Sequence, residues 1–261
     1  MESSSGINID DDTGNLTGGG DHGRFKYCYA NWMAQQEDDL ELLFRTLSSD
    51  SDPHNNDANL MAAVESVLGH LQDYLDNRGS QSARCESPCL FLPSWCTDFE
   101  KSIHWMGGCR ATMCIRLVYA LSGLESEAEA PVMEYLRLRG GRRENLGKIS
   151  DHQFNLIKTL QIKTIMEEDK LSAQMAILQG RIEDERLSRI GNCSREMGDS
   201  RAVEKLLKDA NKLKMDTIKE LLTNILTPIQ AVDMLVASKK LHLFLPQWDK
   251  TRDQILNAPN P

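Results

Sequence analysis

WCTDFEKSIHWMGGCRATMCIRLVYALSG, residues 95–123, combines aromatic, small and apolar residues with little charge. Its second half has apolar residues at helical spacing, namely Met113, Leu117 and Leu121 on one face with Ile115, Val118 and Tyr119 beside them. This pattern predicts a helix that is buried on most sides. Gly107 and Gly108 either end the preceding helical segment or let a neighbouring backbone approach closely. We therefore expect the other helices to pack around residues 95–123.

Amphipathic patterns on both sides of this segment predict further helices. Residues 25–47 have an apolar residue every three or four positions and an opposite polar face, made of Gln35, Glu37, Asp38, Asp39 and Glu41. A polar loop at 48–57 precedes a second helix, which runs from Leu60 to about residues 77–79. Two long helices are expected at 150–189 and 201–225, with a polar hinge at 191–200 between them.

Capping patterns mark the starts of two of these helices. Ser150 and Gln153 form a capping box before the helix at 150–189, and Thr227, Pro228 and Gln230 begin a last apolar helix in the same way. Spacing near seven in the helix at 150–189 raises a coiled-coil dimer as an alternative, but Thr164 interrupts the seam. Packing within one chain is favoured.

Composition limits the classes of function. The chain has 261 residues, of which 40% are hydrophobic, and this suffices for one sizeable folded domain. A net charge of -9 argues against a general nucleic-acid or anionic-membrane binder, because phosphate neutralisation requires clustered Lys and Arg. Proteins are therefore the expected partners.

The seven cysteines have no regular spacing, which favours a reducing compartment. Cys85 and Cys89 form a C-x3-C pattern that is poor for structural zinc, since no second Cys or His pair lies nearby. The first residues have neither a basic nor an apolar targeting region, and no apolar run is long enough to span a membrane. We expect an intracellular protein that is free of membranes.

No arrangement of residues typical of an enzyme is present in the sequence. The six histidines are scattered, and no Gly-rich phosphate loop, zinc motif or nucleophile motif is found. Four arginines at 137–143 fit either a nuclear localisation signal or, preferably, a solvated loop paired with carboxylates. The sequence therefore predicts no catalytic residue and no metal site.

Three motifs, in order along the chain, resemble the plant delay-of-germination (seed dormancy control) domain family. They are YANWMAQQ at 29–36, WMGGCR with RLVYAL at 105–110 and 116–121, and LTPIQA with KKLHL at 226–231 and 239–243, followed by Trp248 and Arg252. The family usually has proline where this chain has Ala111. The resemblance extends over residues 25–253. The same domain also forms the C-terminal part of TGA-type bZIP transcription factors.

The resemblance implies an all-α helical domain that regulates other proteins without being an enzyme. Family members act in seed dormancy, germination and abscisic-acid signalling, and bind type 2C protein phosphatases; others act in pollen. Their N-terminal helix is associated with partner binding. A second reading is a transcription cofactor that pairs with TGA-type factors. Because residues 1–23 have no basic region or zipper, any contact with DNA would be indirect.

A third reading is a haem or other small-ligand sensor. Two histidines of the regulator that names the family are implicated in haem binding, and His242 matches the first of them. Pro246 stands at the second position, and proline cannot ligate iron. We therefore expect no cofactor, and His242 remains the one candidate haem ligand.

Three regions follow from these arguments: an acidic leader at 1–23, expected to be disordered and open to phosphorylation, a helical domain at 24–255 and a flexible tail at 256–261. We expect a nuclear and cytoplasmic protein, and homodimers are an open alternative. The candidate motif and interaction residues are Trp32, Trp95, Trp105, Gly107, Gly108, Arg110, Gln230 and Trp248.

Overall fold

The computed structural model describes residues 21–48, 53–82, 96–123, 146–188 and 193–247. Several sequence features lie outside these residues: most of the leader, Cys85, Cys89, Trp95, the arginines at 137–143, Trp248 and the tail. The described residues form helices and no strand, which confirms the predicted all-α class. None of the described helices is both long and apolar enough to cross a membrane.

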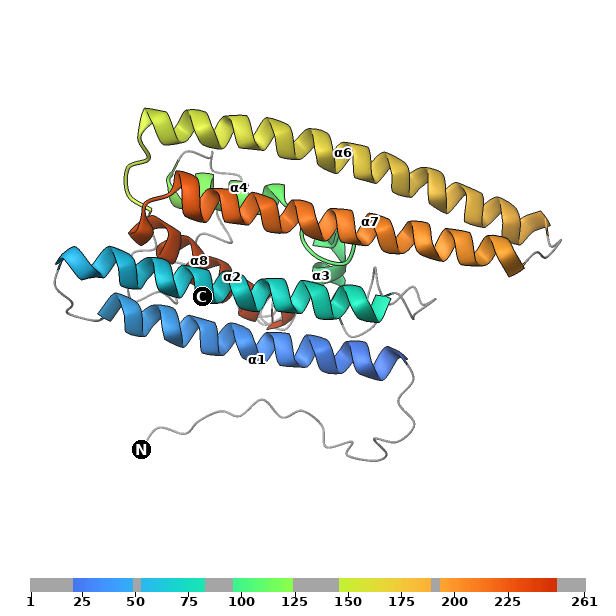
Figure 1. The fold of residues 1–261 in the computed structure, drawn as a ribbon, viewed down its shortest axis with the longest axis horizontal. Helices are drawn as coiled ribbons and strands as arrows, with labels where there is room; N and C mark the ends of the chain where they lie inside the picture. The colour runs from blue at the N-terminus through green and yellow to red at the C-terminus, as the bar shows by residue number, and fades with distance from the viewer. Residues whose placement is uncertain (1–20, 49–52, 83–95, 124–145, 189–192, 248–261) are drawn as a thin grey trace, which may run out of the picture.

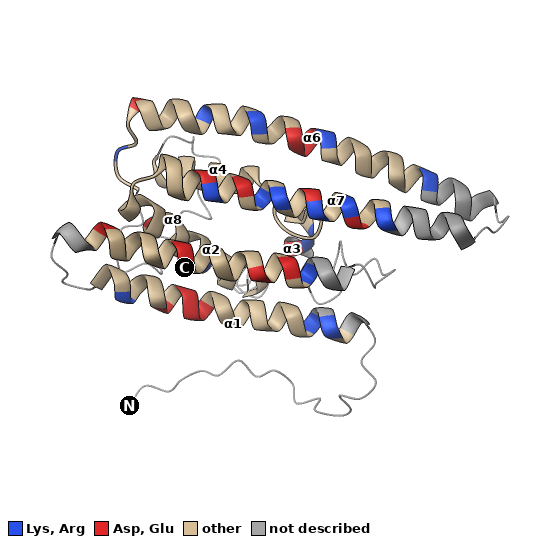
Figure 2. Ribbon diagram, viewed as in Figure 1, with Lys and Arg blue, Asp and Glu red and all other residues tan. Residues whose placement is uncertain are grey.

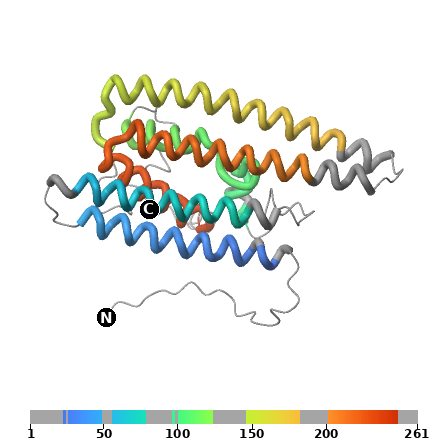
Figure 3. The backbone as a smooth tube through the Cα atoms, viewed as in Figure 1, coloured from blue at the N-terminus to red at the C-terminus, as the bar shows by residue number. Residues whose placement is uncertain are grey.

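Long helices form two antiparallel pairs that lie side by side (Figures 1 and 3). The first pair is α1 (Asp21–Ser48) with α2 (Pro53–Ser82), and the second is α6 (Asp151–Ser188) with α7 (Cys193–Glu220). Contacts between α2 and α7 join the pairs. Shorter elements fill the space against them: α3 (Asp98–Ile103), α4 (Thr112–Leu121), the π-helix η3 (Leu221–Ile225), α8 (Pro228–Phe244) and the 3-10 turn η4 (Leu245–Gln247).

Helix α8 occupies the centre of the main core. Residues on all its sides are buried, from Ala231 and Val232 to Met234, Leu235, Val236 and Ala237. It packs against α1, α2 and α4. Helix α4 supplies Ile115, Val118, Tyr119 and Leu121 to the same core, whereas Met113 is 37% exposed. The predicted core helix at 112–121 is thus confirmed as buried, but the centre of the packing is α8 instead of residues 95–123.

The Gly pair forms a tight turn between α3 and α4. Trp105 and Gly108 pair through two backbone hydrogen bonds, of 2.5 and 3.3 Å, and the residues between them, Met106 and Gly107, have φ values of 45° and 76°. Positive φ at both central residues is the geometry of a type I′ turn. A Cβ at Gly108 would lie 3.4 Å from Lys214 Nζ. Helix α3 has already ended at Ile103, with His104 as its C-cap, so the glycines do not end it. The predicted close approach is present, but the close neighbour is a side chain instead of a backbone.

Three helix starts differ from the sequence prediction. Helix α2 begins at Pro53 within the expected loop, because proline is favoured in a first helical turn. Helix α7 begins at Cys193 and extends through the expected hinge at 191–200, because helices tolerate an isolated glycine such as Gly198 at a modest cost. Helix α1 begins at Asp21, inside the leader, and an acid there suits the positive end of the helix dipole.

Helices α6 and α7 pack against each other within the chain. Thr164, which interrupts the apolar seam of α6, is buried and lies 3.4 Å, oxygen to oxygen, from Thr217 of α7. The capping box at Ser150 is present, with Gln153 N donating to Ser150 Oγ over 3.2 Å. Figure 2 shows acidic and basic residues interspersed along α7. The sequence predicts a solvated face for this helix at Lys205, Lys208, Lys212 and Lys214. The first three are exposed, but Lys214 donates to the Trp105 and Met106 carbonyls, so the prediction is wrong there.

We expect Gly107→Ala to destabilise the fold by about 1 kcal/mol, because the left-handed backbone penalises a Cβ. Gly69→Ala is the matched control: Gly69 is exposed within α2, with open space around the added methyl group, and should stabilise by about 0.5–1 kcal/mol. Urea unfolding midpoints measure both. Shifts of the same sign would contradict the turn geometry.

Candidate functional site: a buried polar cluster and an adjoining cavity

A buried ion pair joins the first helix to the last. Lys239 Nζ of α8 lies 2.7 Å from Asp39 Oδ2 of α1, and the two side chains are 5% and 0% exposed. The same ammonium donates to Gln36 Oε1 over 2.9 Å. Burial lowers the pKa of Lys239, and the Asp39 carboxylate opposes that shift. Because an unpaired buried charge is very costly, this pair ties α1 firmly to α8.

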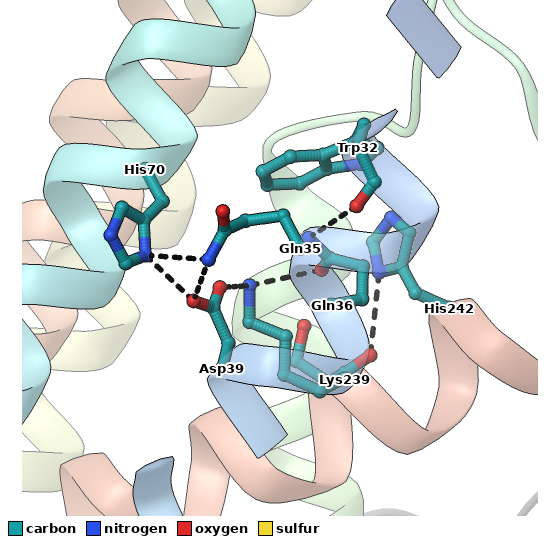
Figure 4. Close-up of polar contacts among 8 residues, drawn as sticks. Trp32, Gln35, Gln36, Asp39, His70, Lys239 and His242 are labelled. Carbon is teal, nitrogen blue, oxygen red and sulfur yellow. Dashed lines mark hydrogen bonds and ion pairs between the residues drawn. The ribbon is translucent and has the colours of Figure 1, made fainter. Parts of the chain in front are cut away.

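The second carboxylate oxygen of Asp39 extends the cluster to α2 (Figure 4). Asp39 Oδ1 lies 2.6 Å from His70 Nδ1 and accepts a hydrogen bond from Gln35 Nε2 over 3.0 Å. Gln35 Nε2 is also 3.2 Å from the His70 ring nitrogen. Three helices thus meet on one carboxylate. The sequence prediction placed Gln35 and Asp39 on the polar outer face of the first helix, which is wrong for Asp39.

Trp32 lies above this cluster within the core. Its ring stacks on Tyr74 of α2 at 4.3 Å between centroids and 10° between planes. Lys239 Nζ lies 5.0 Å from the Trp32 ring centroid, which adds a cation–π contact. Trp32 is only 7% exposed. The tryptophan therefore packs helices together and offers little surface to a partner.

A cavity of about 190 Å³ adjoins the cluster. Its walls come from α1, α2, α3, the 105–108 turn, α4, α7 and α8, and most of the exposed wall is apolar. Residues far apart in sequence line it, among them Trp32, Leu71, His104, Lys214 and His242. The cavity is therefore a feature of the complete fold and of no single motif.

His242 lines this cavity as a neutral imidazole. Its Nδ1 lies 3.3 Å from the Ser238 carbonyl oxygen, and because that oxygen only accepts, Nδ1 carries the proton. Burial, and then the positive charge of Lys239, lower the pKa of His242 to about 4. Among the described residues, no hydrogen bond to Nε2 is found.

The described residues do not fit haem held by paired histidines. The second family position is Pro246, in η4, which has no ligating atom. The cavity at His242 is about 190 Å³, below the roughly 300 Å³ at which drug-sized pockets begin, and haem is larger than such ligands. His242 thus remains a cavity-lining residue.

Helix α3 adds a second histidine and a carboxylate to the wall. Glu100 accepts hydrogen bonds from Tyr29 Oη over 2.9 Å and from the Thr97 backbone N–H over 2.8 Å. Burial, and then the Glu100 charge, raise the pKa of Tyr29. His104 Nδ1 donates to the Glu100 carbonyl over 2.5 Å, and burial lowers the pKa of His104. Both histidines of the cavity are therefore neutral at pH 7.

The central motif is held by charges from α6 and α7. Lys214 Nζ of α7 donates to the carbonyls of Trp105 and Met106 over 3.3 and 3.1 Å and lies 5.4 Å from the Trp105 ring centroid. The Trp105 indole donates to Ser172 Oγ of α6 over 2.9 Å. Arg110 lies over the same ring at 5.6 Å. The Trp-Met-Gly-Gly turn is thus fixed on three sides.

Glu168 of α6 completes this support. Its side chain is 2% exposed and lies 3.3 Å from Arg110 Nη1. Its Oε1 accepts from the Thr112 backbone N–H over 2.9 Å, and its Oε2 accepts from Thr112 Oγ1 over 3.0 Å. Ala111, at the N-cap of α4, makes no side-chain capping bond. A carboxylate from another helix therefore caps α4.

Thiols in the cavity wall are protonated. Burial raises the pKa of Cys96 to about 11 and that of Cys114 to about 12. Thiolates are the reactive form of cysteine, so these side chains are poor nucleophiles at neutral pH. Within the described part of the chain, no three His, Cys, Asp or Glu side chains gather closely enough to hold a metal ion.

Gln230 serves a structural role in the described fold. It completes the capping box of α8, where its Oε1 accepts from the Thr227 backbone N–H over 3.0 Å. It also accepts from Gln153 Nε2 over 2.8 Å and donates to the Leu146 carbonyl over 3.1 Å. This glutamine therefore links the starts of α6 and α8.

The cluster residues Gln36, Asp39 and Lys239 were not predicted as site residues from the sequence. The positions of Gln36 and Asp39 in the sequence could have indicated their burial. Trp32, Gln36, Asp39 and Leu43 are spaced by four, three and four residues, which places them on one face of the helix. A charged residue on an otherwise apolar face indicates a buried pair, but its partner is 200 residues away. Glu168 and Lys214 were missed for the same reason.

Comparisons with known proteins agree with the motifs. Residues 39–120 match the family model described as seed dormancy control. The chain is 30% identical to Protein DOG1-like 3 of Arabidopsis thaliana over 246 residues, which is 88% of this chain and 85% of that protein. It is 31% identical to Protein DOG1-like 1 of the same plant, over 87% of this chain and 89% of that protein.

Similarity to transcription factors is weaker. The chain is 25% identical to Transcription factor TGA5 of Arabidopsis thaliana over 231 residues, which is 88% of this chain and 65% of that factor.

Proposed function

Since this chain belongs to the seed dormancy control family of DOG1-like proteins, we propose that it is a non-enzymatic regulator that acts by binding other proteins. The observation that carries this proposal is identity of about 30% to DOG1-like proteins over most of both chains. The buried ionisable groups support it, because Asp39, Lys239 and Glu168 are engaged with one another or with the backbone. They stabilise a scaffold.

The outer face of α1 is the proposed contact surface. Residues 27, 31, 34, 38 and 41 are exposed and recur at helical spacing, so they form one continuous stripe. Tyr27, which is 68% exposed, is an aromatic anchor of the kind that dominates protein interfaces. Arg45 pairs with Glu41 at the end of the stripe, so Asp38 supplies its negative charge, which favours a basic group on the partner.

A type 2C protein phosphatase of abscisic-acid signalling is the proposed partner, by resemblance to the family. Binding of the purified full chain to such a phosphatase is measured by calorimetry. The double variant Tyr27→Ala with Asp38→Lys should weaken binding at least about 10-fold, since it removes the anchor and reverses a charge. Its unfolding midpoint should be unchanged, because both positions are exposed.

The matched control lies on the outer face of α6. Met166→Ala with Glu167→Lys alters one exposed apolar and one half-exposed acidic residue in the same way, and should change phosphatase affinity less than about 2-fold. Equal losses in both double variants, or no binding by the unaltered chain, would contradict the proposal. Trp32→Ala is unsuitable as a contact test, because Trp32 is buried.

A second candidate is a transcription cofactor that pairs with TGA-type factors. The similarity to TGA5 over most of this chain favours it, because related domains often associate with each other. Contact with DNA would then pass through the TGA partner, and the protein would act in the nucleus as well as the cytoplasm. Size-exclusion chromatography of the chain, alone and with a TGA factor, tests this candidate. Co-elution with the TGA factor supports it, whereas elution of the chain by itself, as monomer or homodimer, contradicts it.

A further inference from the structure

Basic side chains outnumber acidic ones in the described lining of the cavity. Four basic side chains and one acidic side chain line it: Arg78, Arg110, Lys214, Lys239 and Glu100. Asp39 and Glu168 offset Lys239 and Arg110 from outside the lining. Both histidines of the lining are neutral at pH 7. The remaining cations are Arg78 and Lys214, and the contacts of Lys214 bear on what the cavity can bind.

The described hydrogen bonds of Lys214 are to neutral groups. Its Nζ donates to two backbone carbonyls and contacts the face of Trp105. Among the described residues, no carboxylate lies within ion-pair distance of it. An ammonium group has three donors, so two carbonyls leave one N–H available. A buried cation held only by carbonyls and a π face is an incomplete anion site.

The remaining wall is apolar and its volume is small. Leu71, Ile103 and Ile218 are among the aliphatic side chains that line it. An apolar protein cavity of about 150 Å³ takes up benzene. The 190 Å³ here is large enough for one six-membered ring with one small substituent, and too small for a macrocycle or two fused rings with side chains.

We propose that this cavity binds a small organic acid with a single ring, whose carboxylate pairs with Lys214 while its ring packs against Leu71, Ile103 and Ile218. The carboxylate accepts the third N–H of Lys214, which the two carbonyls leave available, and the ring fills volume that the side chains leave open. This inference goes beyond protein binding and does not depend on the identity of the partner.

Proton uptake links this binding to pH. Burial, followed by the charge of Arg78, lowers the pKa of Lys214 to about 7. A carboxylate in contact favours the charged amine and raises that pKa, so binding takes up a proton near neutral pH. Affinity should therefore be level below pH 6 and fall above pH 7. The other titratable groups near Lys214 are Glu100, His104, Cys109, Cys114 and Glu168.

Benzoate titrated into the unaltered full chain provides the test, by calorimetry from about pH 6 to about pH 8.5. We expect stoichiometric binding that weakens about 10-fold or more over this range, as Lys214 loses its proton. Benzyl alcohol has the same ring without the charge, and acetate has the charge without the ring. Both should bind at least about 10-fold more weakly at pH 6, and binding of benzyl alcohol should not change with pH.

Two variants locate the site. Lys214→Met removes the charge and should reduce benzoate affinity at least about 10-fold, whereas Lys212→Met, at a 71% exposed lysine of the same helix, should not. Leu71→Phe fills the cavity from its apolar side and should also abolish binding, without altering any charge. If Lys214→Met does not fold, the pH profile and Leu71→Phe still decide the matter.

Three results would overturn the proposal. They are no benzoate binding at millimolar concentration, equal affinity for benzyl alcohol, and unchanged affinity in Leu71→Phe. None of them bears on phosphatase binding through α1, so failure here and failure of the proposed function are distinguishable.

Discussion

Asp39→Ala should destabilise the protein by about 3–5 kcal/mol, the largest effect expected from a single substitution in the described fold. The change leaves the Lys239 ammonium, whose side chain is 5% exposed, without its counter-ion. It also removes the acceptor of Gln35 and the neighbour of His70. Urea unfolding followed by circular dichroism measures the loss.

Asp38→Ala is the matched control, because Asp38 is the exposed neighbour on the same helix. Its effect should stay within about 0.5 kcal/mol. Joint replacement, Asp39→Leu with Lys239→Met, should recover most of the stability lost in Asp39→Ala, because buried ion pairs can be replaced by apolar residues of similar volume. If the double variant were less stable to urea than Asp39→Ala, the cluster would stabilise the fold through its shape and not through its charge.

Glu168→Ala should cost about 2–4 kcal/mol. The substitution removes the acceptor of the Thr112 backbone N–H and hydroxyl, and leaves Arg110 without its carboxylate. Loss of a helix cap costs about 0.5–2 kcal/mol, and each buried group left without a partner costs about 1–3 kcal/mol. Thermal or urea unfolding measures the effect.

Glu167→Ala is the control for this substitution. Glu167 is the next residue along α6, is 46% exposed and pairs only at the surface with Lys170. Surface pairs contribute about 0–1 kcal/mol, so this change should be nearly silent. Glu168→Gln keeps an acceptor of the same shape and should lose less than alanine. Similar losses at 167 and 168 would mean that α4 needs no carboxylate cap.

Much of the fold follows from the sequence because it is local. Periodicity gave α1, α4 and α6 their positions, and capping residues located the starts of α6 and α8. The helix starts at Pro53 and Cys193 were missed because both lie in polar segments. The prediction read polar composition as loop and gave too little weight to the helix propensity of those residues. Propensity and polarity carry different information about a helix end.

The site was less predictable because its parts are distant in sequence. His242, Trp32 and Trp105 were candidates by resemblance, yet the groups that surround them are Lys239, Lys214 and Glu168. A lysine in a helix is read as solvated unless its partner is known. Pairings across the chain, such as Lys239 with Asp39, have no local signature.

The distance along the chain between Asp39 and Lys239 has a consequence for biosynthesis. The first helix emerges from the ribosome long before α8, and the two residues that pair are 200 positions apart. Until α8 is translated, Trp32, Gln36 and Asp39 have no cover from it. A nascent or truncated chain therefore exposes this face to chaperones and proteases. A chain that ends before α8 should therefore be less abundant in the cell than the full chain.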